Sequence, residues 1–187
     1  MANKDAAFGL RPMGKVGQNR DNQGLSEYGI KASSTETIYF NDPVKVINTG
    51  DIDVAAAGDL LMGSLNGVFY TDSTTSKPTW ANHYAANNAA TDTVGFVADD
   101  PYERFEIQCA GTITSAQIFS VADISYTAGD SANYVSKAEI SATTAAGSSA
   151  QLRILGISKD PDNDEAAANV NVVVNINEHV LTSANGI

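Results

Sequence analysis

Several residue types are scarce in this sequence, and each shortage excludes a class of protein. Only 18% of the 187 residues are charged, and 11 Lys and Arg stand against 22 Asp and Glu, a net charge of −11. Proteins that bind nucleic acids draw much of their affinity from clustered Lys and Arg, and this chain has no basic run. We therefore expect no nucleic-acid partner.

Cysteine and long apolar runs are also scarce. Cys109 is the single cysteine, so no disulfide can form within the chain. No stretch approaches the ~18 consecutive apolar residues of a membrane span, and the first residues, MANKDAAFG, lack the apolar core of a signal peptide. We expect no membrane association and synthesis in a cytoplasm, where the protein either stays or leaves as part of an assembly.

The segment FGLRPMGKVG, near the N-terminus, carries a spacing that suggests nucleotide chemistry. Gly9, Gly14 and Lys15 match the start of a phosphate-binding loop, which also needs a preceding apolar strand, a hydroxyl after the lysine and a following helix. The chain has Val16 at the hydroxyl position, no strand-like run before the glycines and no helical periodicity after them. We therefore interpret residues 1–24 as an extended, turn-rich arm.

Residues 25–187 follow a period of two, which is typical of β-strands. The clearest example is NVNVVVNINEHVL, in which Val170, Val172, Val174 and Ile176 share one side and asparagines occupy the other. A strand with this pattern is buried on one face and hydrated on the other. The four apolar residues are therefore predicted to face the core.

Shorter runs of the same period are separated by Gly, Asn, Asp, Ser and Thr. This arrangement is typical of an antiparallel β-sandwich or barrel, such as a jelly roll. We predict one all-β domain over residues 25–187 with the arm outside it, and at most single helical turns at 53–61 and 164–168. The predicted strands are 37–40, 43–48, 67–70, 93–98, 104–110, 116–121, 150–157 and 169–181, with a bulge at Gly156.

The predicted strand RFEIQCA also indicates which of its side chains face the core. Phe105, Ile107 and Cys109 share one side of the strand, so the thiol is expected to be a small core residue rather than a nucleophile. The residues expected to face outward are Arg104, Glu106 and Gln108.

Two long polar loops are predicted, over residues 70–92 and 141–150. Long loops without secondary structure are uncommon in compact domains unless they contact something. The first loop contains Trp80 and Tyr84, and each aromatic side chain is either a lid on the core or a contact for a partner. The sequence leaves both interpretations open.

The run DPDNDE resembles the start of a calcium-binding loop. Asp160, Asp162 and Asp164 match the first three ligand positions of an EF-hand. The glycine and the final glutamate of that motif are replaced by Glu165 and Asn171. We therefore predict a solvated turn with no bound metal.

No group of residues predicts an enzyme. His83 and His179 have no second histidine or cysteine at metal-ligand spacing, and we expect His179 to lie at the surface. Ser131 follows Gly-Asp, but the strand and helix of a nucleophile elbow are missing around it. We predict no catalytic residues and no cofactor.

Five segments spread over nearly the whole chain carry a resemblance: AAFGLRPMG, YFNDPVKVINTGDI, FVADDPYERFEIQCAGT, LRILGISKDPDN and VVVNINEHVL. Together, and in this order, they resemble a family of tailed-bacteriophage head proteins, several of which are capsid decoration, or cement, proteins. The resemblance implies a virion protein that binds the outer surface of the capsid lattice, often as a homotrimer, with the major capsid protein as its partner.

In that setting the N-terminal arm is expected to anchor the protein. It offers apolar side chains together with the cations Arg11 and Lys15 in a chain of net negative charge, and the loop aromatics offer further contacts. The predicted capsid contacts are Phe8, Leu10, Arg11, Met13, Lys15, Trp80 and Tyr84.

Other functions stay open at this stage. One is a tail or fibre component. Another is the major coat protein itself, although the chain lacks the long helix that the usual tailed-phage coat fold is similar to. A third is a β module that binds carbohydrate or calcium, based on Trp80, Tyr84 and the Asp160 loop. An enzyme is the weakest alternative.

Overall fold

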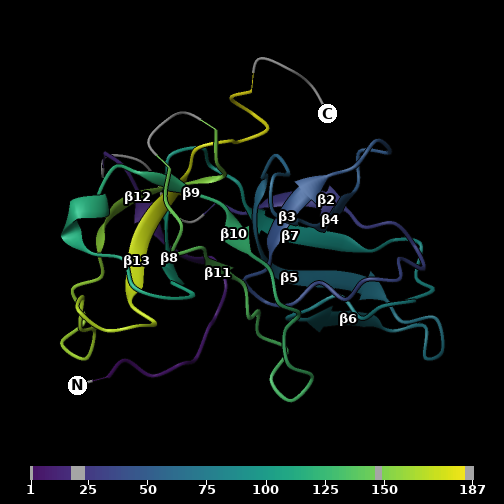
Figure 1. Ribbon diagram of the computed structural model, residues 1–187. Coiled ribbons are helices and arrows are strands. Elements are labelled where there is room, and N and C mark those ends of the chain that lie inside the picture. The colour runs from purple at the N-terminus through teal and green to yellow at the C-terminus, as the bar shows by residue number, and fades with distance from the viewer. Residues whose placement is uncertain (1, 18–23, 146–148, 184–187) are drawn as a thin grey trace.

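We analysed a computed structural model (Figure 1), which describes residues 2–17, 24–145 and 149–183. Within them every named element is a β-strand except one turn of 3-10 helix, η1 (Ser115–Gln117). The named strands pair antiparallel throughout. The predicted antiparallel all-β fold, with sheets packed together as in a β-sandwich, is therefore confirmed.

The first sheet has five strands and belongs to what we call the β13 lobe. β13 (Asn171–Ile176) lies at its centre, between β8 (Glu103–Gln108) and β12 (Leu152–Ile157). Its edges are β1 (Arg11–Lys15) and β9 (Val121–Ala122). One face of the sheet covers a large buried apolar cluster.

The second sheet has six strands and belongs to the β5 lobe. β5 (Gly63–Thr71) is the longest strand and pairs with β7 on one side, and with β3 and β6 on the other. A second, smaller cluster of buried residues lies against this sheet. The other strands are β2 (Ser26–Gly29), β3 (Pro43–Val46), β4 (Ile52–Val54), β6 (Pro78–Ala81) and β7 (Val94–Ala98).

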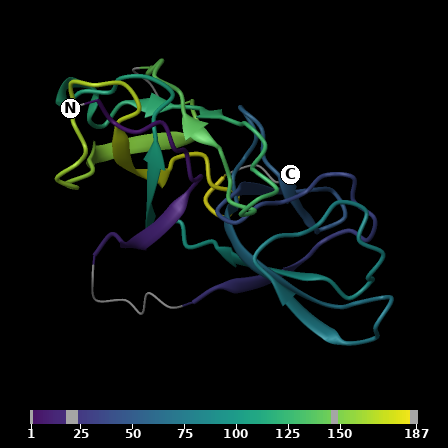
Figure 2. The same cartoon turned by 90° about the horizontal axis from the view of Figure 1, so that it is seen from below.

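The two lobes lie side by side, with the ribbon of β10 (Ile124–Ser125) and β11 (Glu139–Ile140) between them (Figures 1 and 2). The chain after β13 crosses back to the β5 lobe. There the amide of Leu61 donates to the carbonyl of Glu178 at 3.0 Å, and the amide of Val180 donates to the carbonyl of Leu61 at 2.9 Å. These two hydrogen bonds hold the C-terminal segment at the boundary between the two lobes, which we call the seam.

The alternation predicted for the C-terminal strand is confirmed. The inward residues of β13 and the residue before it are buried, and Cys109 lies in the same cluster as predicted. The pairing of β12 with β13 shifts between Ile154 and Gly156, which confirms the bulge. The buried residues are Val170, Val172, Val174 and Ile176.

The predicted strand 116–121 is wrong. Residues 116–121 form η1, a turn and only the start of β9, because Phe119 adopts a positive φ of 69° that ends any strand. At 53–61 and 164–168, where at most single helical turns were predicted, the chain forms the end of β4 and turns. Alanine favours helices, but an isolated helical turn is unstable because nucleation is costly.

Outward-facing polar residues are also more buried than the alternation suggests. Glu106 is 4% exposed and Gln108 is 3% exposed, although both lie on the side of β8 away from the apolar cluster. His179, predicted at the surface, is 1% exposed because the crossing C-terminal segment buries it at the seam. Non-local segments therefore cover positions that the local pattern assigns to solvent.

The prediction that residues 1–24 lie outside the β domain is wrong for residues 9–15. β1 pairs with β8, and Leu10 is fully buried in the cluster of the β13 lobe. The partner strand of β1 lies about 90 residues later in the chain, so no local pattern reveals the pairing. Residues 18–23 of the predicted arm, and residues 146–148 of the second predicted loop, lie outside the described residues.

Candidate partner-binding surfaces

The N-terminal segment binds to its own chain through specific hydrogen bonds. The amide nitrogen of the Asn3 side chain donates to the carbonyls of Asp164 at 2.8 Å and Ala168 at 3.0 Å, and its oxygen accepts from the amide of Asp164 at 2.7 Å. Gln108 donates to the carbonyl of Lys4 at 3.0 Å, and accepts from the amide of Ala6 at 2.9 Å. These contacts explain why Gln108 is buried.

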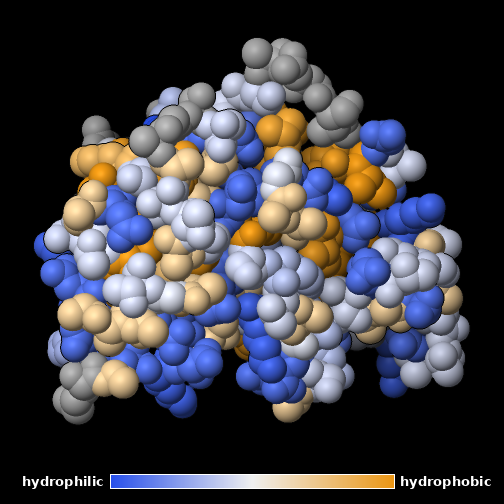
Figure 3. Space-filling model, in the orientation of Figure 1, coloured by the Kyte–Doolittle hydropathy of each residue, from blue (hydrophilic) through white to orange (hydrophobic). Residues whose placement is uncertain are grey.

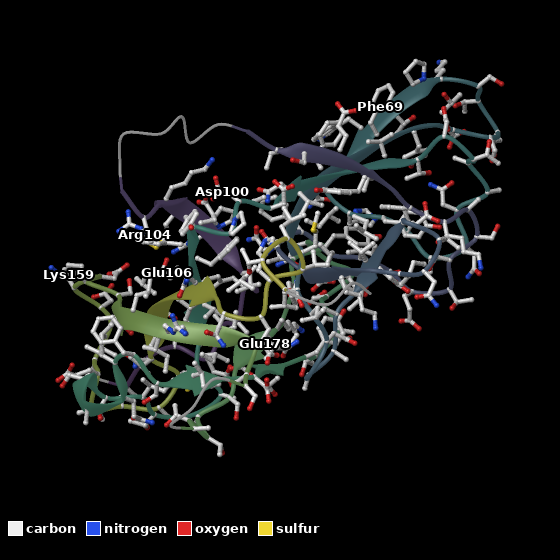
Figure 4. The ribbon with its side chains drawn as sticks, turned by 90° about the horizontal axis from the view of Figure 1, so that it is seen from above. Phe69, Asp100, Arg104, Glu106, Lys159 and Glu178 are labelled. Atoms are coloured by element: carbon white, nitrogen blue, oxygen red, sulfur yellow. The ribbon has the colours of Figure 1, made fainter. Side chains whose placement is uncertain are left out.

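Two of the three cations of the described N-terminal segment meet carboxylates of the same lobe. Arg11 forms an ion pair with Glu106, and the Lys15 ammonium lies 2.9 Å from a carboxylate oxygen of Asp100. Glu106, Arg104 and Asp100 follow the β1–β8 side of the lobe in Figure 4. The backbone amide of Gly14 donates to Glu103 at 2.8 Å. The chain itself therefore supplies carboxylates to two of the predicted capsid contacts, Arg11 and Lys15.

The predicted arm contacts fall into two groups. Leu10 is fully buried, so it is a core residue and offers no surface to a partner. Phe8 is half-buried, and the guanidinium of Arg11 lies 4.6 Å from the centre of its ring. Met13 is exposed, and Lys15 is half-buried in its ion pair.

Tyr84 is also a core residue. It is fully buried in the cluster of the β5 lobe, and its hydroxyl donates to the carbonyl of Lys31 at 3.3 Å. Its backbone pairs with Ile38 through two hydrogen bonds of 2.9 and 3.1 Å. Of the two interpretations left open by the sequence, the lid on the core applies to Tyr84.

Trp80 is instead exposed, and it belongs to an aromatic surface on the outer side of the β5 lobe. Trp80 on β6 is the direct cross-strand partner of Phe69 on β5, and the two side chains are 57% and 40% exposed. The Trp80 ring also contacts Phe96 of β7, with ring centres 4.8 Å apart. With Val94, the other partner of Phe69 on this side, these residues form what we call the Trp80 face.

A glycine shapes this surface. Gly67 has a φ of +152°, at the point where the pairing of β5 with β7 shifts register. A β-carbon at Gly67 would lie 2.6 Å from Cζ2 of Trp80, so the indole lies directly over bare backbone. The position of Trp80 is therefore set by the strand beneath it and by Phe96.

Where β5, β6 and β7 lie together, the sheet is consequently apolar on both sides. Val68 is fully buried in the core, whereas the next residue, Phe69, points outward, as Figure 4 shows at the outer edge of the lobe. Sequence analysis identified Trp80 but missed Phe69 and Phe96. The signal was present in the run GVFY, where apolar residues do not alternate with polar ones.

Other exposed apolar residues are scattered. The face in Figure 3 shows apolar patches separated by hydrophilic residues rather than one continuous band. Phe119 is the most exposed large apolar residue in the described chain, at 73%, and stands alone after η1. His83 stacks on Tyr134 with ring centres 3.6 Å apart, which joins the loop after β6 to a distant loop. Isolated exposed apolar residues are normal on protein surfaces.

The Asp160 loop has the hydrogen bonding of a polar turn. Asp160 accepts from the amide of Asp162 at 3.1 Å, and the side-chain amide of Asn163 donates to the carbonyls of Ser158 and Asn171, both at 2.9 Å. The N-terminal segment and this loop flank a polar hollow of about 660 Å³. Across the described residues, no group of three or more acidic, His or Cys side chains is arranged to hold a metal ion.

Two buried ionisable side chains, Asp42 and His179, accept hydrogen bonds from neighbouring groups of the fold. Asp42 is fully buried and accepts hydrogen bonds from the amide of Tyr39 at 2.7 Å and the hydroxyl of Tyr126 at 3.2 Å. Burial raises the pKa of Asp42 to about 6. Burial lowers the pKa of His179, whose Nδ1 accepts from the amide of Leu181 at 3.1 Å.

Comparison with known proteins adds no relative. No protein-family model matches this chain, and neither a curated protein nor a solved structure is detectably similar to it. Among the described residues, no helix has the length and apolar character needed to cross a lipid bilayer. The candidate function therefore rests on the sequence and on the surface of this chain.

Proposed function

We propose that this protein is a non-enzymatic structural component of a tailed-phage virion that binds the outer surface of the capsid lattice and stabilises it. The proposal combines the resemblance of five sequence segments to phage head proteins with the surface of the β5 lobe. In this role the major capsid protein is the partner, and the virion is the location.

The Trp80 face is the observation that carries the proposal. A sheet that is apolar on both sides is normally covered on both sides, and the outer side here exposes Trp80 and Phe69. Aromatic residues are enriched in the cores of protein interfaces and among the residues that dominate binding energy. This face replaces the N-terminal segment as the proposed anchor, because that segment is held by its own lobe.

The remaining properties suit a protein that is made in many copies and then assembled. A net charge of −11 keeps free copies apart through mutual repulsion. Contacts within a rigid β body lose little conformational entropy when the protein attaches. We also propose a homotrimer, because closed oligomers usually match the symmetry of the sites that they occupy.

Co-sedimentation tests the proposal. Purified protein is mixed with capsids stripped of it, with isolated tails and with no particle, and the pellets are compared. We expect the protein to pellet with capsids only, and the Trp80→Ser variant to remain in the supernatant. Pelleting with tails would favour the tail component, and no pelleting with either particle would contradict a virion role of this kind.

A further inference from the structure

The Trp80 face has a distinctive charge pattern around its apolar centre. Glu27 of β2 is the direct cross-strand partner of Phe96 and therefore lies on the same side of the sheet. Asp92 lies in the loop before β7, and it accepts from the amide of Thr71, the last residue of β5, at 3.1 Å. Asp72 follows directly in the β5–β6 turn, and Lys77 is the one cation of that turn.

These carboxylates form no ion pair within the described residues, although Asp72 and Asp92 accept hydrogen bonds from neighbouring threonines. The ion pairs found within the described residues involve other carboxylates, at positions 59, 100, 106 and 130. Hydrogen bonds from Thr75 lower the pKa of Asp72, and hydrogen bonds from Thr71 lower the pKa of Asp92, so both stay ionised at neutral pH. The rim of the face is therefore negative.

From this pattern we infer that the Trp80 face binds a protein surface that has an apolar centre and a rim of Lys and Arg. The apolar centre would pack on Trp80, Phe69 and Phe96, and the basic rim would meet the carboxylates. The inference names the partner chemistry of the site in the proposed function, and it rests on that proposal only for the identity of the particle.

The same charges distinguish this partner from the two other occupants of an aromatic sheet face. A second copy placed face to face would bring Glu27, Asp72 and Asp92 against their own equivalents, in a chain whose net charge is −11. Like charges across an interface are destabilising. A neutral oligosaccharide can stack on the indole and donate hydroxyl hydrogen bonds to the carboxylates, but it carries no charge, so its binding should depend little on salt.

The Trp80 side chain also holds a defined position in the unbound protein. Trp80 is confined between Phe96 and the bare backbone at Gly67. A side chain that is already ordered loses little rotamer entropy on association, so its burial contributes more of its apolar area to affinity. This predicts that binding depends steeply on Trp80 and on its neighbour Phe69.

Trp80 provides a direct readout, because it is the single tryptophan of the chain. Its fluorescence emission moves to shorter wavelength when the exposed indole is covered. We would titrate the protein with a short peptide in which leucine and lysine alternate, and with a matched peptide in which glutamate replaces lysine. We expect a blue shift with the lysine peptide at low salt, its loss at high salt, and no shift with the glutamate peptide.

Matched variants locate the effect. Phe69→Ser should weaken binding of the lysine peptide on the order of tenfold, and the Glu27→Lys, Asp92→Lys double variant should reverse the preference between the two peptides. Phe119→Ser removes an even more exposed phenylalanine from the other lobe and should leave binding unchanged. Circular dichroism of each variant checks that the sheet content is retained.

Several results would overturn the inference. They are a response to both peptides alike or to neither, a blue shift produced by oligosaccharides instead, or a shift that grows with protein concentration alone, which indicates a second copy. Stripped capsids separate the inference from the proposed function. A peptide preference without capsid binding contradicts the function only, whereas capsid pelleting with unchanged Trp80 emission contradicts the inference only.

Discussion

The β13 lobe and the β5 lobe treat the outer side of their sheets in opposite ways. In the β13 lobe the outer side of β8 carries Glu106 and Gln108, and the N-terminal segment covers both. In the β5 lobe the outer side carries Phe69 and Trp80, and nothing in the described chain covers them. The polar side is buried and the apolar side is exposed, which is the reverse of what polarity alone predicts.

The difference shows which interactions allow a chain segment to cover the outer side of a sheet. The N-terminal segment contributes hydrogen bonds and ion pairs that match the polar groups of β8 one by one, so those groups lose water without being left unpaired. No segment among the described residues covers the Trp80 face, so its apolar area stays in contact with water, which is unfavourable. Among the described residues the outer side of β8 is covered by the chain itself, whereas the Trp80 face stays exposed.

The largest predicted effect is the unfolding of the β13 lobe by a charge placed in its core. Val172→Asp places a carboxylate in a fully buried apolar site, which costs several kcal/mol and exceeds what a marginally stable fold tolerates. We expect loss of the cooperative thermal transition by circular dichroism. Thr143→Asp, at an exposed position, is the control, and a Val172→Asp variant that melts like wild type would contradict the register of β13.

The second prediction concerns how much the N-terminal segment contributes to the stability of that lobe. Leu10→Ala should lower the free energy of unfolding by about 2–4 kcal/mol, because Leu10 is fully buried in the core. Met13→Ala, on the exposed side of the same strand, should change it by less than about 0.5 kcal/mol. Urea denaturation measures both values. Equal, small effects would mean that the N-terminal segment is an arm independent of the lobe.

The third prediction concerns the pH dependence of folding stability that arises from Asp42, the buried residue just before β3. The ordinary pKa of Asp42 is 3.8 and burial raises it to about 6, so the folded state binds the proton more tightly than the unfolded state. Stability from this group should therefore rise as the pH falls through 6, reach its full value below about 4, and be lost again as the pH rises. The gain is of the order of 2–3 kcal/mol.

His179 opposes this gain over part of the same range, because its lowered pKa makes the folded state lose stability as the pH falls below 6.5. The comparison is therefore made with the Asp42→Asn variant, which keeps His179. Urea denaturation between pH 5 and 8 should show that wild type gains more stability on acidification than the variant does. Parallel pH profiles for the two proteins would exclude a raised pKa at Asp42.

The smallest prediction compares the exposed aromatic residues of the two lobes. Phe119 has a φ of +69°, which is strained for a bulky side chain, whereas Phe69 lies in a regular strand. Phe119→Asn should raise the free energy of unfolding by up to about 1 kcal/mol, because asparagine adopts the left-handed conformation more easily. Phe119→Leu keeps the strain and should show no such gain, and equal stability of both variants would contradict the strain.

Much of the fold follows from local pattern. The alternation of Val172, Val174 and Ile176 with asparagines predicts β13 and its buried side, and the non-alternating Ile154–Gly156 region contains the bulge where a glycine suggested one. These features follow from the geometry of a single strand, in which neighbouring side chains point to opposite faces. The acidic charge and the single buried cysteine also follow from sequence.

The tertiary structure alone decided which sides are covered and what the exposed sides display. The N-terminal segment pairs with a strand about 90 residues away, and Phe69, Trp80 and Phe96 come from three different strands. A period of two says that a residue faces one side of its strand, but not what lies on that side. That depends on how strands pair across long loops, because register and covering contacts form only when the whole chain packs.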